Sequence, residues 1–290
     1  MSSLAPADGG PAVAVRSRRR RPGSRVVRAV QAAALAVLLA SCSSDVPDEP
    51  AAVVDDTARP DTPTASSTPA EPTTAAERFG WHPRGGDEFD AGGLDLSKWR
   101  LYGGAGSSGI GIRAPEAVSV RNGNLVITGW REYAGGVAWH AQPATTYGRW
   151  EFRARVEEGT GYAPAILLWP DSDNWPVDGE IDVMEVVAGD RQENHTTVHY
   201  GADHQRIDQT VPGDFTDWHT YAVDWQWDRI TVYIDGEEVF RTTEPAAIPH
   251  GPMHLAVQLD VGPQGTWIPA PDATTPETVS LYVDWVRMYH

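Results

Sequence analysis

Apolar and polar residues alternate in short runs through the C-terminal two-thirds of the chain, and turn-forming residues separate the runs. Alternation with a period of two predicts β-strands, because successive side chains of a strand point to opposite faces. Between two such runs, Asp235-Gly236 predicts a tight hairpin turn. No stretch has the sustained periodicity of a helix. The clearest strand predictions cover residues 124–128, 147–156, 178–185, 229–240 (a hairpin), 254–261 and 279–289.

These runs predict one all-β domain at about 79–290. All 12 tryptophans lie between Trp81 and Trp285, so the large side chains of a core fall within this range. Many antiparallel strands in a domain of this length imply two sheets packed face to face. We therefore expect a two-sheet β-sandwich.

Residues 42–78 differ sharply in composition. They are rich in alanine, proline, threonine, aspartate and glutamate and contain no aromatic residue. Such a segment cannot bury enough apolar surface to offset the entropy of ordering. We predict a disordered linker over 42–78.

The first 41 residues are typical of an export signal. Seven arginines precede an apolar run from Ala29 to Ala40, which is shorter than the roughly 20 residues of a membrane helix. The alternative is a retained membrane helix. Leu39-Ala40-Ser41-Cys42 resembles a bacterial lipobox, with Cys42 as the lipidated residue, and the alternative is an ordinary secretory signal. We expect an extracellular protein that is lipid-anchored to the cell membrane or secreted.

The charge of the mature chain restricts its partners. Without residues 1–41 the chain keeps 16 basic and 39 acidic residues, a formal net charge of −23. Such a surface repels nucleic acid and anionic lipid headgroups. We expect a monomer that binds a neutral polymer, binds no nucleic acid and meets the membrane only through its lipid.

The predicted strand at 178–185 carries an unusual number of carboxylates. Glu180 and Asp182 are two residues apart and therefore share one face of the sheet. Glu185 is five residues from Glu180 and would point to the opposite face of a regular strand. One extra residue in a β-bulge near Val183 and Met184 returns Glu185 to the shared face.

Three carboxylates on one face suit the hydrolysis of glycosides. Retaining glycosidases use a nucleophile and a general acid/base whose carboxyl groups lie about 5–5.5 Å apart. Crowded carboxylates raise one another's pKa, so one can stay protonated while another is ionised. A calcium site or a solvated acidic face is the alternative. Alternation with Ile181 and Val183 disfavours a flexible calcium loop.

The segment 175–185 resembles the active-site strand of glycoside hydrolase family 16, in its laminarinase-like branch with the bulged E-x-D-x-x-E motif. Further segments resemble the family in the same order along the chain, at 87–99, 147–155, 198–201, 218–225 and 283–289. The resemblance implies a concanavalin-like β-jelly-roll with a cleft on its concave sheet. It also implies retaining endo-hydrolysis of a β-linked polysaccharide without a catalytic cofactor. Glu180 would be the nucleophile, Asp182 the assisting carboxylate and Glu185 the general acid/base.

Aromatic and polar residues outside this motif are candidates for binding the polysaccharide. The resemblance brings His199 to the catalytic carboxylates, and a surface or structural histidine is the alternative. Gln258 occupies a position where relatives often carry a polar group that faces the sugar. Trp175 and Trp169 stand near the mouth of the strand, where their rings can stack on pyranose faces, and core packing is the alternative. Trp225 lies on an alternating face that fits a cleft and a core equally.

Many family members hold a structural calcium ion on the convex side. Glu88, Gly123 and Asp284 match the positions of its ligands. A buried aspartate on the last strand needs a cation or hydrogen-bond donors as partners. We therefore expect a possible structural Ca²⁺ at these residues.

Two departures from the family pattern bear on the substrate. Ala163 and Leu167 stand where laminarinases commonly carry tryptophan, and Gln258-Leu259-Asp260 replaces an Asn-Leu-Ala segment. The expected substrate is a β-1,3-glucan or a mixed β-1,3/1,4-glucan, and these departures leave the linkage open. The alternative functions are a transglycosylase that remodels wall glycan and a non-hydrolytic glycan-binding protein on the same fold.

Overall fold

The computed structural model describes residues 73–141 and 144–290. The predicted signal peptide 1–41, Cys42 and the linker up to residue 72 lie outside the described residues. Within the described part, no helix is long and apolar enough to cross a membrane.

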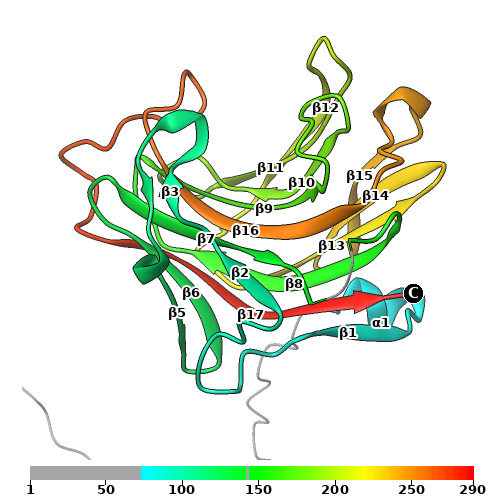
Figure 1. The fold of residues 1–290 in the computed structure, drawn as a ribbon, viewed down its shortest axis with the longest axis horizontal. Helices are drawn as coiled ribbons and strands as arrows, with labels where there is room; N and C mark the ends of the chain where they lie inside the picture. The colour runs from blue at the N-terminus through cyan, green and yellow to red at the C-terminus, as the bar shows by residue number, and fades with distance from the viewer. Residues whose placement is uncertain (1–72, 142–143) are drawn as a thin grey trace, which may run out of the picture. The chain divides into compact units, whose positions relative to one another are not determined.

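Two sheets packed face to face form the domain, as the alternating sequence predicts (Figure 1). We call them the outer sheet and the cleft sheet. The outer sheet has the strand order β15 (Glu237–Thr242), β14 (Arg229–Ile234), β13 (His219–Gln226), β8 (Gly148–Val156), β17 (Val279–Tyr289), β6 (Asn124–Gly129) and β5 (Val118–Arg121), and β1 (Pro83–Asp87) pairs with β17.

The cleft sheet is the curved upper layer of the ribbon (Figure 1). Its strand order is β12 (Gln205–Pro212), β11 (Glu193–Tyr200), β10 (Glu180–Glu185), β9 (Tyr162–Pro170), β16 (Met253–Val261), β7 (Tyr133–Trp139), β4 (Ile112–Arg113) and β3 (Gly104–Ala105), and β2 (Trp99–Leu101) pairs with β7. All pairings are antiparallel except that of β4 with β7. Three short 3₁₀ helices lie between strands: η1 (Ser107–Gly109), η2 (Pro115–Ala117) and η3 (Pro245–Ala247).

The core lies between the two sheets and follows the period-two pattern. On β13, Tyr221, Val223 and Trp225 alternate inward and are fully buried. Ile230 and Val232 of the neighbouring β14 join them in one continuous hydrophobic cluster. Each buried side chain of this size stabilises the fold by roughly 1.5–3 kcal/mol relative to an exposed one. The alternation of apolar and polar residues along the strands therefore accounts for the core of the all-β sandwich.

Two hairpins close through two-residue turns, and the one at Asp235-Gly236 confirms the prediction. Asp235 and Gly236 have φ values of 51° and 74° and join β14 to β15. Asn122 and Gly123, with φ values of 52° and 76°, join β5 to β6 in the same way. Two successive left-handed residues match the right-handed twist of a hairpin, which is why Asn-Gly and Asp-Gly occupy these turns.

The domain starts before residue 79, so the predicted linker boundary is wrong. A short helix, α1 (Ala75–Phe79), begins after Thr74, whose side chain caps it. Ala75 and Ala76 are buried against the outer sheet, and the backbone N–H of Ala75 donates to Glu151 Oε1 at 2.6 Å. Composition misleads here because alanine is common in the linker and is also small enough for close contact with a sheet.

Candidate active site

The β-bulge predicted in the acidic strand is present in β10. Asp182 pairs with Thr197 of β11 and Glu185 pairs with His195, so three steps along β10 match two along β11. The register against β9 shifts at the same place, between Asp182 and Met184. Because of this extra residue, Glu180, Asp182 and Glu185 share one face of the cleft sheet.

His199 of β11 lies beside this carboxylate cluster, as expected. It pairs directly with Glu180 across the two strands, and its Nε2 atom is 3.3 Å from Asp182 Oδ2. That oxygen is buried and has no hydrogen-bond partner among the described residues. His199 Nδ1 lies 3.0 Å from Nε2 of His204, which extends the polar chain toward the surface. A buried, unsatisfied carboxyl oxygen is costly, so Asp182 is suited to hold a proton.

Burial and mutual repulsion raise the pKa of all three carboxyl groups. The pKa of Glu180 lies well above its ordinary value because of burial first and the Asp182 charge second, while His199 and Trp175 oppose the shift. Burial and then the Glu185 charge raise the pKa of Asp182 well above its ordinary value. The pKa of Glu185 is raised to about 7 by burial and then by Glu180. Protons are therefore shared within the cluster near neutral pH.

Trp175 is placed on the carboxylate cluster rather than in the core. Its indole N–H donates to Glu180 Oε2 at 2.6 Å, and its ring is 39% exposed. Trp169 at the end of β9 lies nearly parallel to it, with ring centroids 6.4 Å apart. The two rings form an aromatic surface next to Glu180, which suits the apolar face of a sugar.

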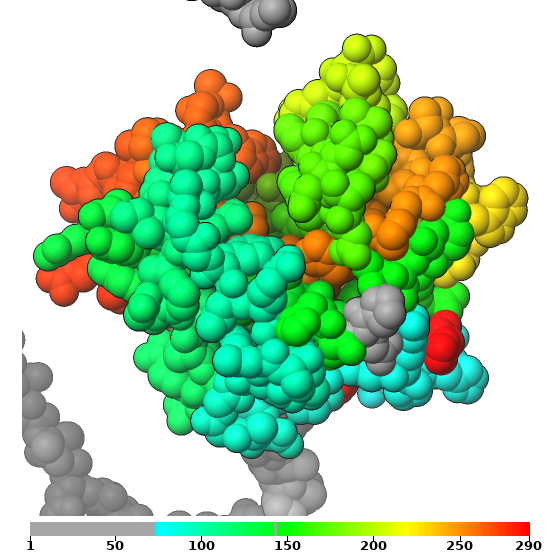
Figure 2. Space-filling model, in the orientation of Figure 1, coloured from blue at the N-terminus to red at the C-terminus, as the bar shows by residue number. Residues whose placement is uncertain are grey.

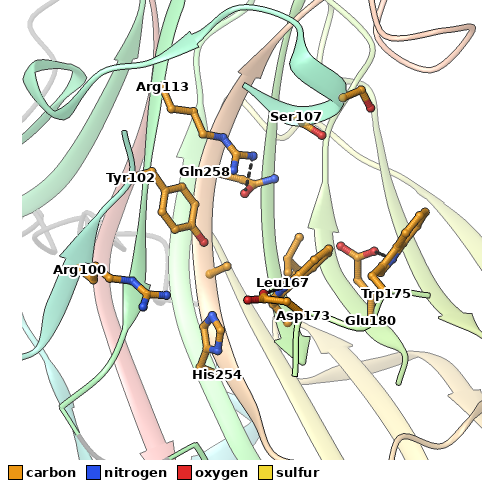
Figure 3. A pocket seen from close by; sticks show the side chains of 13 residues that line it. Arg100, Tyr102, Ser107, Arg113, Leu167, Asp173, Trp175, Glu180, His254 and Gln258 are labelled. Carbon is orange, nitrogen blue, oxygen red and sulfur yellow. Dashed lines mark hydrogen bonds between the residues drawn. The ribbon is translucent and has the colours of Figure 1, made fainter. Parts of the chain in front are cut away.

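A cavity of about 510 Å³ opens on the cleft sheet beside Glu180. Figure 2 shows this face hollowed between blue-green and green parts of the chain. In Figure 3, Arg113, Tyr102 and Gln258 reach in from one side, and Glu180 and Trp175 from the other. A hollow with Glu180 in its wall and the rings of Trp169 and Trp175 beside it is suited to binding a sugar next to a reactive carboxyl group.

Residues 111–287 match the family described as Glycosyl hydrolases family 16. This segment contains β10, His199 and most of the cavity wall. The chain belongs to glycoside hydrolase family 16. It is therefore a glycoside hydrolase, and its fold is the family's β-jelly-roll.

Relatives of this family 16 hydrolase include several glucanases. A beta-glucanase from Rhodothermus marinus is 32% identical over 246 residues, which cover 72% of this chain and 85% of that protein. A glucan endo-1,3-beta-glucosidase A1 from Niallia circulans is 28% identical over 273 residues, and the chain spans 39% of its length. A solved structure, SCLam, a non-specific endo-beta-1,3(4)-glucanase of family 16, has 30% identity and a TM-score of 0.63, with 72% of this chain and 91% of that chain covered.

Trp225 of the hydrolase does not line the cleft, so that interpretation is wrong. It lies on the outer sheet with its side chain fully buried between the sheets, and its N–H donates to the carbonyl of Pro249 at 3.1 Å. Its ring contacts Tyr147 edge-on, with centroids 5.2 Å apart. The alternation of β13 points Trp225 toward the core. The sequence allowed either the core or the cleft for this residue.

Gln258 faces the cavity as expected, but it belongs to a polar group that the sequence did not reveal. Arg113 of β4 donates to Gln258 Oε1 at 3.0 Å (Figure 3). It also forms an ion pair with Asp260 at 3.1 Å. Its guanidinium lies over the ring of Tyr102, 4.9 Å from the centroid. Burial raises the pKa of Tyr102 to about 12, so its hydroxyl stays protonated. Tyr102 and Arg113 are far in sequence from Gln258 and Asp260, and no local pattern joins the two pairs.

Trp267 is a second site residue that the sequence did not single out. It is 39% exposed and contacts His195 with ring centroids 5.0 Å apart. A hydrogen bond from Trp267 lowers the pKa of Glu185, against the larger effect of burial. Next to it, Ile268 packs on Ala163 and Val187. The small residue at 163, where laminarinases commonly carry tryptophan, is thus covered by this loop.

The residues expected to bind calcium do not fit such a site. Glu88 is paired with Arg287 at 2.8 Å, and Asp284 is paired with Arg153 at 2.9 Å. Gly123 lies in the turn between β5 and β6. Each carboxylate therefore already has a guanidinium partner, and the arrangement gives the calcium hypothesis no support.

Among the described residues, one group could hold a metal ion by its geometry. Ligand atoms of Glu180, Asp182 and His199 lie within 4.8 Å of one another. This group consists of two of the three clustered carboxylates and the neighbouring histidine. Their arrangement fits proton sharing as well as binding of a metal ion. Glycoside hydrolysis by two carboxyl groups needs only the side chains.

Proposed function

We propose that the chain is a retaining endo-β-glucanase that hydrolyses β-1,3-glucan or mixed β-1,3/1,4-glucan by double displacement. The observation that carries the proposal is the bulge of β10, which sets Glu180, Asp182 and Glu185 on one face beside an open cavity. The names of the glucanases to which the chain is similar support the substrate class.

In the first step, Glu180 attacks the anomeric carbon as an ionised carboxylate. Glu185 donates its proton to the glycosidic oxygen, the bond from carbon to that oxygen breaks, and a glycosyl ester forms on Glu180. The pKa of about 7 keeps much of Glu185 protonated at neutral pH, as a general acid requires.

In the second step, Glu185 takes a proton from a water molecule. The water oxygen attacks the anomeric carbon from the face that the leaving group vacated, and the carboxylate of Glu180 is released. Two inversions give net retention of configuration. Asp182 assists by holding a proton between its neighbours, which allows Glu180 to ionise despite its burial.

His199 and Trp175 favour the ionised form of Glu180. The histidine places a potential positive charge next to the cluster, and the indole N–H donates directly to the carboxylate. Both oppose the effect of burial on the pKa of Glu180. The environment thus separates the roles of two chemically identical carboxyl groups.

Digestion of a panel of β-glycans tests this proposal. The panel contains β-1,3-glucan, mixed-linkage glucan, β-1,4-glucan and a galactan, with Glu180→Gln as the blank. We expect new reducing ends on the first two, with mid-sized oligosaccharides early in the reaction and a β-anomer as the first product in NMR. No turnover of any β-glycan between pH 4 and 9 contradicts the proposal.

The same digestion separates hydrolysis from the two alternatives. A transglycosylase yields chains longer than the substrate, and a binding protein yields tight binding in calorimetry without products. All three carboxylates are present on one face of β10, which favours hydrolysis over mere binding.

We also propose that Cys42 anchors the hydrolase to the outside of the cell membrane through a lipid. The motif Leu39-Ala40-Ser41-Cys42 after an apolar run supports this. Detergent phase partitioning of the full-length protein tests it. The wild type should enter the detergent phase and Cys42→Ser the aqueous phase, whereas equal partitioning contradicts the anchor.

A further inference from the structure

A fully buried amide side chain lies directly behind the bulge of β10. Asn194 and Thr196 of β11 are fully buried, as is Val198 on the same face, which belongs to the hydrophobic core. His195, between the first two, is only partly buried and pairs with Glu185 across the strands. A primary amide inside a hydrophobic core is costly unless its donor and acceptor atoms are satisfied.

The bulge supplies the partners of this amide. An inserted residue breaks the regular ladder and leaves backbone groups without strand partners. Asn194 Oδ1 accepts the backbone N–H of Glu185 at 3.0 Å, and its Nδ2 donates to the carbonyl of Val183 at 3.3 Å. Thr196 Oγ1 donates to the same carbonyl at 3.3 Å. One side chain therefore binds the backbone on both sides of Met184.

We propose that Asn194 is a positioning residue for Glu185. By satisfying both backbone groups, its amide holds the bulge in the form that turns Glu185 toward the cleft. The proposal rests on the role of Glu185 as general acid/base given above. Asn194 touches neither the substrate nor the reacting atoms, and it acts only through the backbone of Glu185.

A misplaced general acid has a specific kinetic effect. Cleavage of a polysaccharide expels a sugar hydroxyl, which needs the proton of Glu185, whereas 2,4-dinitrophenolate leaves without one. The ratio kcat/KM reports the steps up to formation of the glycosyl ester, before Glu185 is needed as a base. Damage to the fold or to Glu180 lowers kcat/KM for both substrates, and damage to Glu185 lowers it for the polysaccharide alone.

The experiment compares kcat/KM of the wild type and Asn194→Leu on two substrates. One is the preferred polysaccharide, and the other is the 2,4-dinitrophenyl β-glycoside of the oligosaccharide that it releases. General acid catalysis contributes about 10²–10⁴-fold, so we expect a loss of about 10²-fold on the polysaccharide and less than about threefold on the aryl glycoside. Glu185→Gln should show the same selectivity more strongly.

Thr231→Val is the matched control, because Thr231 is also a fully buried polar residue on a strand, in the outer sheet away from the bulge. It should leave the ratio of the two kcat/KM values unchanged. Equal losses on both substrates, or no loss for Asn194→Leu beyond that of the control, overturn the positioning role.

Asn194→Asp serves if the leucine variant fails to fold. A protonated aspartic acid can still accept from Glu185 and donate to Val183, but an ionised one cannot donate. Activity of this variant relative to the wild type at the same pH should rise as the pH falls, and a constant ratio with normal circular dichroism overturns the proposal. A wild type inactive on both substrates refutes the proposed function itself, whereas an active wild type with an indifferent Asn194 variant refutes only the positioning role.

Discussion

Two buried acidic sites of this hydrolase, one in each sheet, differ in their surroundings. In the outer sheet, Asp224 is buried between Arg149 at 3.0 Å and Arg229 at 3.2 Å. In the cleft sheet, Glu180 and Asp182 are also buried, and the basic side chain beside them is that of His199, 3.3 Å from Asp182.

This contrast separates structural acids from chemical ones. Two guanidinium groups pair with the carboxylate of Asp224, so this acid connects neighbouring strands of the outer sheet. Carboxylates without such partners repel one another, and their pKa values rise toward the range in which protons are exchanged. Acidic composition alone does not distinguish the two cases.

The largest expected effects come from one substitution in each sheet, which should lower activity in the cleft sheet and stability in the outer sheet. Glu180→Gln should lower kcat on the order of 10⁴-fold, with a melting temperature no lower than that of the wild type. Asp224→Asn should keep kcat but lose about 1–3 kcal/mol of folding free energy, because the half-buried Arg149 and Arg229 each lose a charged partner. Kinetics and urea unfolding of both variants check this, and the comparison fails if either variant loses both properties.

Asp182→Asn should lower kcat by about 10²-fold and make the fold more stable. Because the pKa of Asp182 is raised in the folded state, ionising it disfavours the fold as the pH rises from the ordinary carboxyl range toward the folded value. The variant's gain should therefore be small at about pH 4 and grow to about 1 kcal/mol near neutrality. Thermal unfolding across pH measures it, and a loss of stability at neutral pH contradicts the account.

The pH profile of the wild type should reflect Glu185. As its pKa is about 7, kcat/KM should fall about tenfold per pH unit above that value, because the general acid loses its proton. In Trp267→Phe, which removes a hydrogen bond that lowers this pKa, the alkaline limb should move to higher pH. A limb that stays in place, or one that begins above pH 9, indicates a different acid.

The smallest effect is expected for Trp175→Phe, which keeps an aromatic ring but removes the N–H that donates to Glu180 at 2.6 Å. Loss of one hydrogen bond of about 1 kcal/mol predicts a kcat/KM lower by about fivefold. The acidic limb should move to higher pH, since the ionised nucleophile loses a donor. Trp225→Phe is the control, and it should change stability without changing KM.

Features with a local signature could be read from the sequence. The two strands around Asp235-Gly236 follow from alternation and from turn residues that tolerate positive φ. The bulge could be inferred because the spacing of Glu180, Asp182 and Glu185 conflicts with a regular strand, and the structure resolves the conflict as expected.

Features that depend on packing between distant segments could not be read in this way. The alternation of β13 assigns Trp225 to one face but does not say whether that face is core or cleft. Arg113 meets Asp260 across 147 positions of sequence, and Trp267 reaches Glu185 from a loop without periodicity. The buried alanines of α1 resemble the linker in composition. Only their contacts with the outer sheet show that they belong to the domain.

The central claim is that Glu180 is the nucleophile and Glu185 the general acid/base. Trapping the covalent intermediate with a 2-deoxy-2-fluoro glycoside that carries a dinitrophenyl leaving group tests it most directly, followed by peptic digestion and mass spectrometry. The account predicts one label per chain, attached to Glu180 and absent in Glu180→Gln. A label on Asp182 or Glu185, or an active enzyme that acquires no label, contradicts it.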